Sequence, residues 1–587
     1  MVDLQAKPYY LDDDAIRWVE TTIAAMTIEE KIGQLFINMG ASRDEAYLKD
    51  VLERYHIGGV RYNPGPAAAV HEQNRILQEN SKIPLLIAAN TEAGGNGACT
   101  DGTEVGFHVK VAATGNPHYA YEMGRVAGVE ASAVGCNWSF APIVDINRNW
   151  RNPIISSRAF SQDPDLVLAM AKAYMQGINE SGIVCAMKHY PGDGIDERDQ
   201  HLCSSVNSLS CAEWDATFGK VYAGMIEAGV HSVMAGHIML PAYSRHFNPS
   251  LADADLLPAT LSKELITDLL KGKLGFNGLV ITDASHMVGL TCAMKRRDLV
   301  PASIAAGIDM FLFFNDPDED FGWMMDGYKS GVITEARLQD ALTRILGVKA
   351  SLGLHKKAKT EIVPPKSALE RIGLPANKAI FAEVADKAIT LVKNIAPSPL
   401  PISPEKYRRV LLVPQKGPDN PVGTLFGGRG PAPVDVMAEQ LRAAGFAVSI
   451  FESAVEKLMK LPPEERGRAF MGAYADKTSI SSLVSQYDLV IHVANVTGLF
   501  QPVQRISWMA TKGTADIPWY VHEIPTIFVS VNCPFHLADA PQVKCYINTY
   551  DPRETTLKLL VEKLMGKSEF KGVSPVDAFC GMLDTRI

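Results

Sequence analysis

One fourteen-residue stretch of this sequence is crowded with side chains that can take up or release protons. Residues 188–201 read KHYPGDGIDERDQH, and the apolar run before them, GIVCAM, is typical of a buried strand. Within the stretch, Asp199 stands two positions before His201. A carboxylate so placed can accept a hydrogen bond from one ring nitrogen and thereby orient the other nitrogen for proton transfer. The pattern indicates a general acid/base pair, and a solvated charged loop is the alternative that these residues alone leave open.

A metal site is a further alternative for the same stretch. Its ligands would be Asp193, Asp199, His189 and His201. No H-x-H or H-E-x-x-H spacing, as zinc sites often use, supports that arrangement. We therefore expect no metal here.

Asp283 is the second candidate for chemistry. It lies in GLVITDASHM, where an apolar run opens into a loop. A carboxylate at such a position can be a nucleophile, a metal ligand or the N-cap of a helix. The residues around it do not decide among these roles.

Polar side chains also follow most of the other apolar runs. They are Asn90, Glu92, Asp145, Asn147, Lys188, His189, His237, Asn315 and Asp316. Arg158, in SSRAFSQDP, has a guanidinium that can fork onto two neighbouring oxygens. Many donors and acceptors suited to hydroxyl groups, set in an apolar-walled cleft, indicate a sugar as the ligand.

Eight apolar runs alternate with segments of helical spacing between residue 30 and about residue 350. The runs are IGQLFINM, IGGVRYN, IPLLIAAN, CNWSFAPIVDIN, GIVCAMKH, VHSVMAGHIM, GLVITDA and GIDMFLFFN. Near-continuous apolar runs are typical of strands buried on both faces, so the pattern predicts a (β/α)8 TIM-type barrel over residues 1–355. A doubly wound open sheet is the alternative. In a barrel, the polar residues after the strands would meet at one end.

A second, smaller domain is expected beyond the barrel. Residues 356–375, KKAKTEIVPPKSALERIGLP, interrupt the alternation with lysines and a proline pair and are predicted to be a linker. The runs RVLLVPQ, FAVSIFES, DLVIHVANV, PTIFVSVNCPF and VKCYINTYD then predict an α/β sandwich domain over residues 376–587. The GGRG at 427–430 can cradle an anion, but without a Walker lysine a plain loop is favoured.

The composition argues against several classes of protein. The net charge of -9 is spread along 587 residues without a basic block, so we expect no nucleic-acid partner. No stretch approaches 18 apolar residues and no basic amphipathic helix is present, so we expect no membrane partner. The nine cysteines are scattered without a C-x-x-C pair, and the N-terminus shows no secretory signal. We interpret the cysteines as reduced thiols and expect a cytoplasmic location.

These pieces together resemble glycoside hydrolase family 3, and within it the β-N-acetylglucosaminidase branch. The loop pattern Lys-His-x-Pro-Gly-x-Gly-x4-Asp-x-His is highly specific. The other motifs that carry the resemblance are MTIEEKIGQLF, FAPIVDIN, SSRAFSQDP, VMAGHIMLP, GFNGLVITDASHM, AITLVKN and KGVSPVDAF. They cover nearly the whole chain in the family's order.

The resemblance implies a retaining exo-β-N-acetylglucosaminidase. Asp283 would form a covalent glycosyl-enzyme, and His201, oriented by Asp199, would be the general acid/base on a mobile loop. Such a reaction needs only a nucleophile and a proton shuttle, so no cofactor is expected. The partner would be a small carbohydrate, and we also expect a homodimer.

The resemblance also implies the residues of the sugar site, with one departure. The expected set is Arg158, Lys188, His189, Asn90, Glu92 and His237. After the third strand the branch usually has Asp-Gln-Glu-Gly-Gly followed by basic residues, whereas this chain has NTEAGGNGACTDG. Asn90 thus replaces an aspartate that accepts hydrogen bonds from sugar hydroxyls, and Glu92 is the expected substitute. This leaves the exact sugar open.

Four alternatives to an N-acetylglucosaminidase follow. A β-glucosidase or another exo-β-glycosidase of the same family comes first. The second is phosphorolysis, because a neutral His201 would not repel an incoming phosphate as a carboxylate base would. A non-catalytic sugar-binding protein and a metal-dependent barrel hydrolase are the others.

Overall fold

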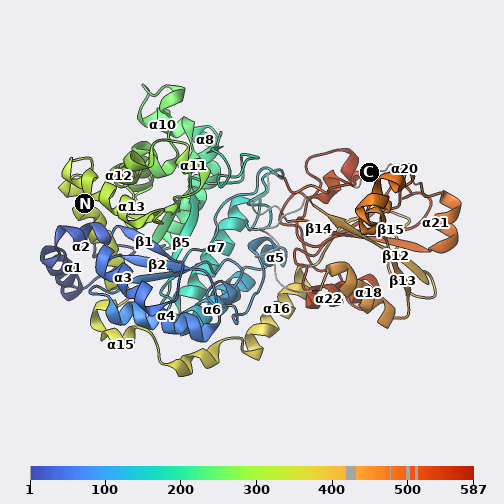
Figure 1. The fold of residues 1–587 in the computed structure, drawn as a ribbon, viewed down its shortest axis with the longest axis horizontal. Coiled ribbons are helices and arrows are strands. Elements are labelled where there is room, and N and C mark those ends of the chain that lie inside the picture. Colours follow the sequence, from blue (N-terminus) through green and yellow to red (C-terminus); the bar gives the residue numbers. More distant parts are fainter. Residues whose placement is uncertain (1, 418–430, 476, 498–502, 509–512) are drawn as a thin grey trace. The chain divides into compact units, whose positions relative to one another are not determined.

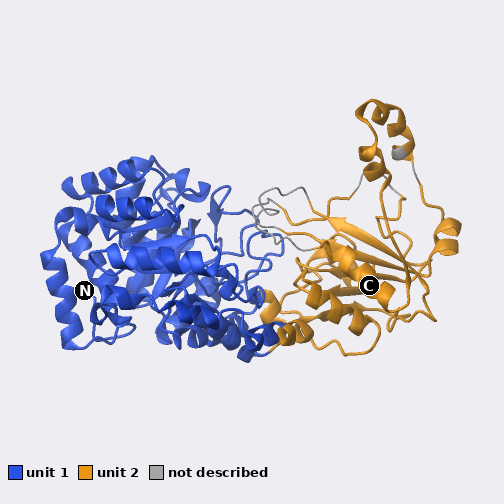
Figure 2. Ribbon diagram, turned by 60° about the horizontal axis from the view of Figure 1, so that its bottom comes forward, with its two compact units in different colours: residues 1–108, 116–381 blue, residues 109–115, 382–587 orange. Residues whose placement is uncertain are grey.

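The computed structural model describes residues 2–417, 431–475, 477–497, 503–508 and 513–587. The chain divides into two compact units, residues 1–108 with 116–381 and residues 109–115 with 382–587 (Figure 2). The GGRG sequence at 427–430, considered above as an anion cradle, lies outside the described residues. No helix in the described part of the chain has the length and apolar character needed to cross a membrane.

The first unit is a closed barrel of parallel strands, in the order β1-β10-β9-β7-β5-β4-β3-β2 (Figure 1). Each of the eight apolar runs contains one of these strands, so the predicted (β/α)8 barrel is confirmed and the open sheet is wrong. The strands are β1 (Phe36–Gly40), β2 (Gly59–Tyr62), β3 (Leu86–Ala89), β4 (Trp138–Ser139), β5 (Val184–Tyr190), β7 (Ser232–Ala235), β9 (Leu279–Ala284) and β10 (Met310–Leu312). All seven residues of β5 are buried, which explains its near-continuous apolar sequence.

Helices surround this barrel (Figure 1). The longer ones are α1 (Asp13–Ala25), α3 (Glu45–Tyr55), α4 (Ala67–Asn80), α6 (Pro117–Ala133), α7 (Pro164–Asn179), α9 (Lys220–Glu227), η5 (Glu264–Lys273), α12 (Arg296–Ala306), α13 (Pro317–Lys329) and α14 (Glu335–Ser351). The shorter ones are α2 (Ile28–Gly33), α8 (Cys211–Trp214), α10 (Pro241–Phe247), α11 (Val288–Thr291) and α15 (Lys359–Ile362). A small two-stranded sheet joins β6 (Ser205–Val206) and β8 (Ile238–Met239).

Side-chain caps fix where several of these helices begin. Asp163 accepts a hydrogen bond from the N–H of Asp165 at the start of α7, and proline follows the cap. Asp316 accepts from the N–H groups of Asp318 and Glu319 at the start of α13. The polar residue Asp316 after the eighth apolar run is therefore a helix cap.

The segment predicted to be a linker is folded onto the barrel. It contains α15 and a short turn of helix, η7 (Lys366–Arg371), and it belongs to the first unit. The Pro364 carbonyl lies 2.7 Å from His71 Nε2 of α4, and the Gly373 N–H donates to Glu130 of α6. The last helix of this region, α16 (Pro375–Ala388), runs across the boundary between the two units at residue 381.

The second unit contains a six-stranded sheet in the order β11-β16-β15-β14-β12-β13. Its strands are β11 (Thr390–Asn394), β12 (Arg409–Lys416), β13 (Ala447–Ile450), β14 (Leu489–Asn495), β15 (Thr526–Ser530) and β16 (Cys545–Asn548). The five predicted runs each contain a strand. The edge strand β11, which pairs antiparallel with β16, was not predicted.

The helices of the second unit are α18 (Pro433–Ala443), α19 (Ala454–Lys460), α20 (Pro463–Ala475), α21 (Ile480–Gln486) and α22 (Glu554–Leu564). Residues 109–115, inserted between β3 and α6 in the sequence, also belong to this unit and include most of α5 (His108–Ala112). Buried Lys110 in this insertion forms an ion pair of 2.5 Å with Asp551. All nine cysteines of the chain are free thiols in the structure.

Candidate active site

The candidate residues occupy the C-terminal ends of barrel strands. Glu92 follows β3, Lys188 and His189 end β5, His237 follows β7, and Asp283 ends β9. All pairs of neighbouring strands in the barrel are parallel, so these ends meet at one rim, where barrel enzymes build their sites.

Glu92 is the centre of an ion cluster at this rim. Its carboxylate accepts hydrogen bonds from Arg158 Nε and Nη2, both at 2.9 Å. Lys188 Nζ lies 2.6 Å from the same group. Burial by itself raises the pKa of Glu92, but the two cations outweigh it and hold that pKa well below its usual range. Three of the predicted sugar-binding residues therefore form one charged group, in which a guanidinium fork and an ammonium share a carboxylate.

Asp283 has one carboxylate oxygen that no protein donor occupies in the described chain. Oδ1 accepts the N–H of Ala284 at 2.7 Å, whereas Oδ2 lies 3.9 Å from His189 Nε2. Burial by itself raises the pKa of this carboxyl. The imidazoles of His189, His237 and His201 outweigh burial and lower the pKa to about 2. The side chain is an ionised carboxylate with one oxygen open to a ligand.

Asp283 does not cap a helix. The next helix, α11, begins at Val288 and its N-cap position is Met287. The N-cap role considered for Asp283 is therefore wrong.

The carboxylate of Asp145 orients the imidazole ring of His189. His189 Nδ1 lies 2.7 Å from Asp145 Oδ2, and the His189 backbone N–H donates to Asp145 Oδ1. Asp145 is fully buried after β4. The arrangement fixes the imidazole so that Nε2 faces Asp283.

The loop after β5 carries the Asp199–His201 pair. His201 Nδ1 lies 2.7 Å from Asp199 Oδ1, which also accepts the backbone N–H of His201. The other oxygen, Asp199 Oδ2, is buried without a hydrogen-bond partner in the described chain. About 25% of the His201 side chain is exposed, whereas Asp199 is buried. Asp199 thus orients one ring nitrogen of a histidine that solvent can still reach.

Two glycines allow the loop to turn away from β5. Gly192 and Gly194 have φ values of 116° and 102°. A Cβ at Gly194 would lie 2.1 Å from the carbonyl oxygen of Ile146, and one at Gly192 would lie 2.1 Å from Cδ1 of Phe218. Only glycine fits at these two positions.

His237 and Asn90 differ from the other predicted sugar ligands. Both ring nitrogens of His237 have protein partners, Thr260 Oγ1 at 2.8 Å and the Ala284 carbonyl at 3.0 Å. Burial lowers the pKa of His237 to about 4. Asn90 is half-buried after β3, and within the described chain its side chain makes no hydrogen bond. Their contribution to sugar binding remains a prediction.

Sequence reasoning missed several residues that shape this site. Asp145 ends the run CNWSFAPIVDIN, so its position was visible but its partner was not. Arg61, at the end of β2, interacts electrostatically with Glu92 and His286, and burial lowers its pKa. Gln200, between the two residues of the pair, has no sequence signal beyond its position.

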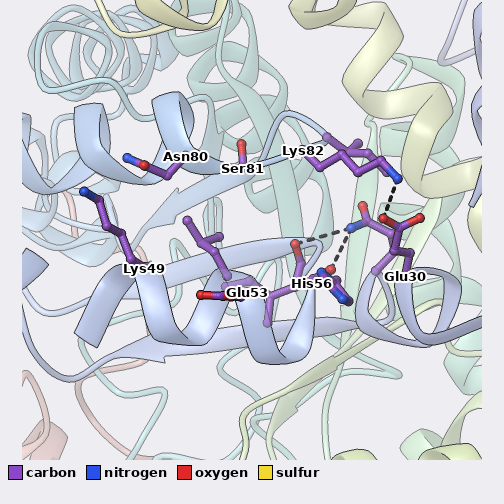
Figure 3. Close-up of a pocket in the computed structure, with 11 residues that line it drawn as sticks. Glu30, Lys49, Glu53, His56, Asn80, Ser81 and Lys82 are labelled. Carbon is purple, nitrogen blue, oxygen red and sulfur yellow. Dashed lines mark hydrogen bonds and ion pairs between the residues drawn. The ribbon is translucent and has the colours of Figure 1, made fainter. Parts of the chain in front are cut away.

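A separate pocket of about 380 Å³ opens at the other end of the barrel (Figure 3). Gln34, Ile57 and Ile83, which precede β1, β2 and β3, are among its lining residues. Lys82 and Glu30 form an ion pair of 2.5 Å at one side of this pocket. The N-terminal ends of barrel strands are usually concerned with stability, and none of the predicted site residues lies here.

No metal-binding cluster accompanies the rim in the part of the chain that the structure describes. There, no three His, Cys, Asp or Glu side chains are grouped so that they could hold a metal ion. Asp193, Asp199, His189 and His201 do not form such a group, and the absence of a metal remains an expectation.

The barrel thus carries an ionised carboxylate at the end of its seventh strand and a histidine–aspartate pair on the loop after its fifth, which can serve as a nucleophile and a proton shuttle. The family model for the glycosyl hydrolase family 3 N-terminal domain matches residues 27–348. The chain belongs to glycosyl hydrolase family 3, which confirms the family that the motifs predicted.

Two proteins are similar to this chain over its whole length. The β-N-acetylglucosaminidase/β-glucosidase of Cellulomonas fimi is 44% identical over 588 residues, which cover 100% of both chains. The solved structure of the β-glucoside phosphorylase BglX is 40% identical, has a TM-score of 0.89 and covers 99% of both chains.

A third likeness concerns the fold alone. A family 3 β-N-acetylglucosaminidase from Paenibacillus has a TM-score of 0.75 at 24% identity, over 94% of this chain and 99% of the other.

Proposed function

We propose that this protein is a retaining exo-β-glycosidase that removes terminal β-linked N-acetylglucosamine and also accepts β-linked glucose. The observation that carries the proposal is Asp283, a buried carboxylate with a lowered pKa and one oxygen that accepts no hydrogen bond from the described residues. Such an oxygen is available to attack an anomeric carbon. The cytoplasmic location and the homodimer remain predictions.

In the first step, Asp283 Oδ2 attacks the anomeric carbon as the glycosidic bond breaks. The oxygen of the leaving group takes a proton from His201, whose Nδ1 is held by Asp199 at 2.7 Å. The product is a covalent glycosyl ester on Asp283. In the second step His201 takes a proton from water, which attacks the same carbon and restores the Asp283 carboxylate. Two inversions give net retention of configuration.

The cluster of Glu92, Arg158 and Lys188 is proposed to hold the hydroxyl groups of the terminal sugar. A carboxylate accepts from hydroxyl hydrogens, and the two cations donate to hydroxyl oxygens. The ion pairs of 2.9 Å and 2.6 Å preorganise these groups before the sugar binds. The substrate range is taken from similarity, because the Cellulomonas fimi relative is named for both activities.

Phosphorolysis is the second candidate. It is favoured by the similarity to a β-glucoside phosphorylase at 40% identity over 99% of both chains. Phosphate would replace water in the second step, give its proton to His201 and attack the glycosyl ester to release a sugar 1-phosphate. A neutral imidazole does not repel this anion as a carboxylate base would.

One substrate panel tests both candidates. 4-Nitrophenyl β-N-acetylglucosaminide and β-glucoside are offered in phosphate and in a zwitterionic buffer of matched pH and ionic strength, each with and without EDTA. Cleavage of both with retention, unchanged by EDTA, supports the glycosidase proposal. Phosphorus NMR of the phosphate arm shows whether a glycosyl phosphate forms. No cleavage of either glycoside, or cleavage that EDTA abolishes and a divalent ion restores, contradicts the proposal.

A further inference from the structure

Gln200 is the residue between Asp199 and His201, and its side chain is buried. Only 1% of Gln200 is exposed, although its neighbours Glu197 and Arg198 on the same loop are exposed. A buried amide on a charged loop needs partners for both its donor and its acceptor.

The Gln200 amide has one partner at the barrel rim and one near the start of the loop. Gln200 Oε1 accepts the backbone N–H of His237 at 2.7 Å, directly after β7. Its Nε2 donates to Asp193 Oδ2 at 3.4 Å, near the start of the loop. Gly236 allows this approach, because a Cβ there would lie 3.2 Å from Gln200 Oε1. The side chain therefore ties the far part of the loop to its base and to the barrel rim.

Asp193 is itself fixed to the site. Its backbone N–H donates to Asp145 Oδ1 at 2.7 Å, and Asp145 is the carboxylate that orients His189. Asn152 Nδ2 donates to the Asp193 carboxyl at 2.8 Å. Gln200 thus joins the loop to the same carboxylate that orients the imidazole facing Asp283.

The backbone on either side of this amide is held by the segment that follows the nucleophile. The Gly289 N–H donates to the Gln200 carbonyl at 3.0 Å, and the Val288 N–H donates to the His201 carbonyl at 3.1 Å. Both donors lie at the start of α11, the helix that follows β9 and Asp283. The acid/base pair and the nucleophile are therefore connected through one short segment.

We infer that Gln200 is a positioning residue that holds His201 where it can give a proton to the leaving group of a sugar bound at Asp283. The inference rests on the proposed function, in which His201 is the acid/base. Glutamine suits the position because one end of its amide accepts and the other donates. Methionine has similar size but neither group. Glutamate would place a second carboxylate against Asp193, whose pKa burial and Asp145 already raise to about 8.

The decisive experiment compares Gln200→Met with Gln78→Met. Gln78 is a matched buried amide on α4, whose Nε2 and Oε1 both pair with the backbone of Leu85 at 3.0 Å, before β3 and away from the site. Each variant loses one donated and one accepted hydrogen bond within the barrel unit. Both are assayed with a 2,4-dinitrophenyl and a phenyl β-glycoside of the same sugar.

For Gln200→Met we expect kcat/KM on the phenyl glycoside to fall about 10- to 100-fold, because a misplacement near 1 Å has an effect of that order. The dinitrophenyl glycoside needs little protonation, so its loss should stay below about threefold. Labelling of Asp283 by a 2-deoxy-2-fluoro glycoside should persist. Gln78→Met should change both substrates by the same factor. Gln200→Asn, which keeps both polar atoms on a shorter side chain, should lie between wild type and Gln200→Met.

His201→Ala separates the failure of this inference from failure of the proposed function. If His201→Ala discriminates between the two leaving groups and neither Gln200 variant does, Gln200 is not a positioning residue. If His201→Ala itself does not discriminate, the acid/base assignment fails first. Should Gln200→Met not fold, Gln200→Asn decides by the same ratio of leaving-group effects.

Discussion

Two buried carboxylates lie at opposite ends of the barrel strands. Asp309, at the N-terminal ends, is surrounded by the cationic side chains of Lys271, Arg337 and Arg344. Asp283, at the C-terminal ends, is surrounded by three imidazoles. Both carboxylates are buried in the barrel, Asp283 within β9 and Asp309 directly before β10. The comparison shows what distinguishes a structural charge from a chemical one.

Asp309 has partners for both of its oxygens. Oδ1 accepts from Lys271 Nζ at 3.0 Å and from the Arg337 guanidinium. Oδ2 accepts the backbone N–H of Val280 at 2.8 Å. Each oxygen of Asp309 thus has at least one donor, which is the arrangement expected of a buried ion cluster that stabilises the fold.

Asp283 and Asp199 are satisfied only in part. Asp283 Oδ2 accepts no protein hydrogen bond in the described chain, and Asp199 Oδ2 is buried without a partner there. Unsatisfied buried oxygens are costly, and proteins keep them chiefly where a ligand or a proton is to be bound. Both ends carry buried charge, and the difference lies in the carboxylate oxygens. Both oxygens of Asp309 have hydrogen-bond partners, whereas Asp283 Oδ2 and Asp199 Oδ2 have none in the described chain.

Asp283→Asn should have the largest effect on activity. It removes the nucleophile while keeping the size and the Ala284 contact, so kcat should fall roughly 10⁴-fold or more. The comparison with Asp309 predicts little change in stability, because few protein contacts are lost. Intact-mass spectrometry after incubation with a 2-deoxy-2-fluoro glycoside should show label on wild type and none on the variant. Label on another carboxylate would contradict the assignment of Asp283.

His201→Ala should have the next largest effect, and it should depend on the substrate. Loss of an acid/base typically lowers the rate about 10²- to 10⁴-fold, with the greater loss for poor leaving groups. Asp199→Asn should resemble it, and the double variant should be little worse than His201→Ala, because the pair acts as a unit. Steady-state kinetics over a series of aryl glycosides measures this. Multiplicative losses in the double variant would show that the two residues act independently.

Asp309→Asn should affect stability and leave the chemistry intact. Removing this charge leaves Lys271, Arg337 and Arg344 with Asp340 as their remaining carboxylate partner. The cost in the free energy of unfolding should therefore be at or below about 3 kcal/mol, the lower end for a broken buried pair. Denaturant unfolding followed by circular dichroism gives the value. Asp326→Asn, at an exposed position on α13, is the matched control and should change stability by less than about 0.5 kcal/mol.

Fluorosugar labelling of the folded fraction should be normal for Asp309→Asn. If Asp309→Asn is as stable as wild type but inactive, Asp309 takes part in the chemistry and its assignment as a structural charge is wrong.

The sequence was informative wherever an element is buried on both faces. The eight barrel runs were visible because parallel strands such as β5 expose no polar face. The edge strand β11 was not predicted, whereas the opposite edge strand β13, which is shorter and mostly exposed, lies in the predicted run FAVSIFES. Strand β11 begins two residues after the end of α16, so no turn signal separates its apolar residues from those of the helix.

In the candidate site, residues at strand ends could be predicted from the sequence, whereas contacts made by loop residues could not. Asp283, Lys188 and His189 were found because they end strands, where position along the chain determines position at the rim. The role of Gln200 was not found because its partners, Asp193 and His237, are brought to it by the folding of a loop. The clustering of Glu92 with Arg158 also depends on residues 66 positions apart. Such contacts between loops are set by tertiary packing and leave no periodicity in the sequence.

The pH dependence of glycosyl-enzyme formation should show the smallest change, and it sharpens the contrast between the two ends of the barrel. Histidines near Asp283 lower its pKa to about 2, so the carboxylate remains ionised above about pH 3. With a 2,4-dinitrophenyl 2-deoxy-2-fluoro glycoside the leaving group needs little protonation, so labelling of the wild-type protein, which keeps all three imidazoles, reports on Asp283. The rate constant for labelling should then be flat from pH 7 to pH 4, because only protonation of Asp283 would lower it and that begins below this range. Intact-mass time courses at each pH give the rate constant, and circular dichroism at pH 4 verifies that the protein is still folded. A decline centred near pH 5 in folded protein would show that burial outweighs the imidazoles at Asp283. Its open oxygen would then belong to a protonated acid, unlike the fully paired carboxylate of Asp309.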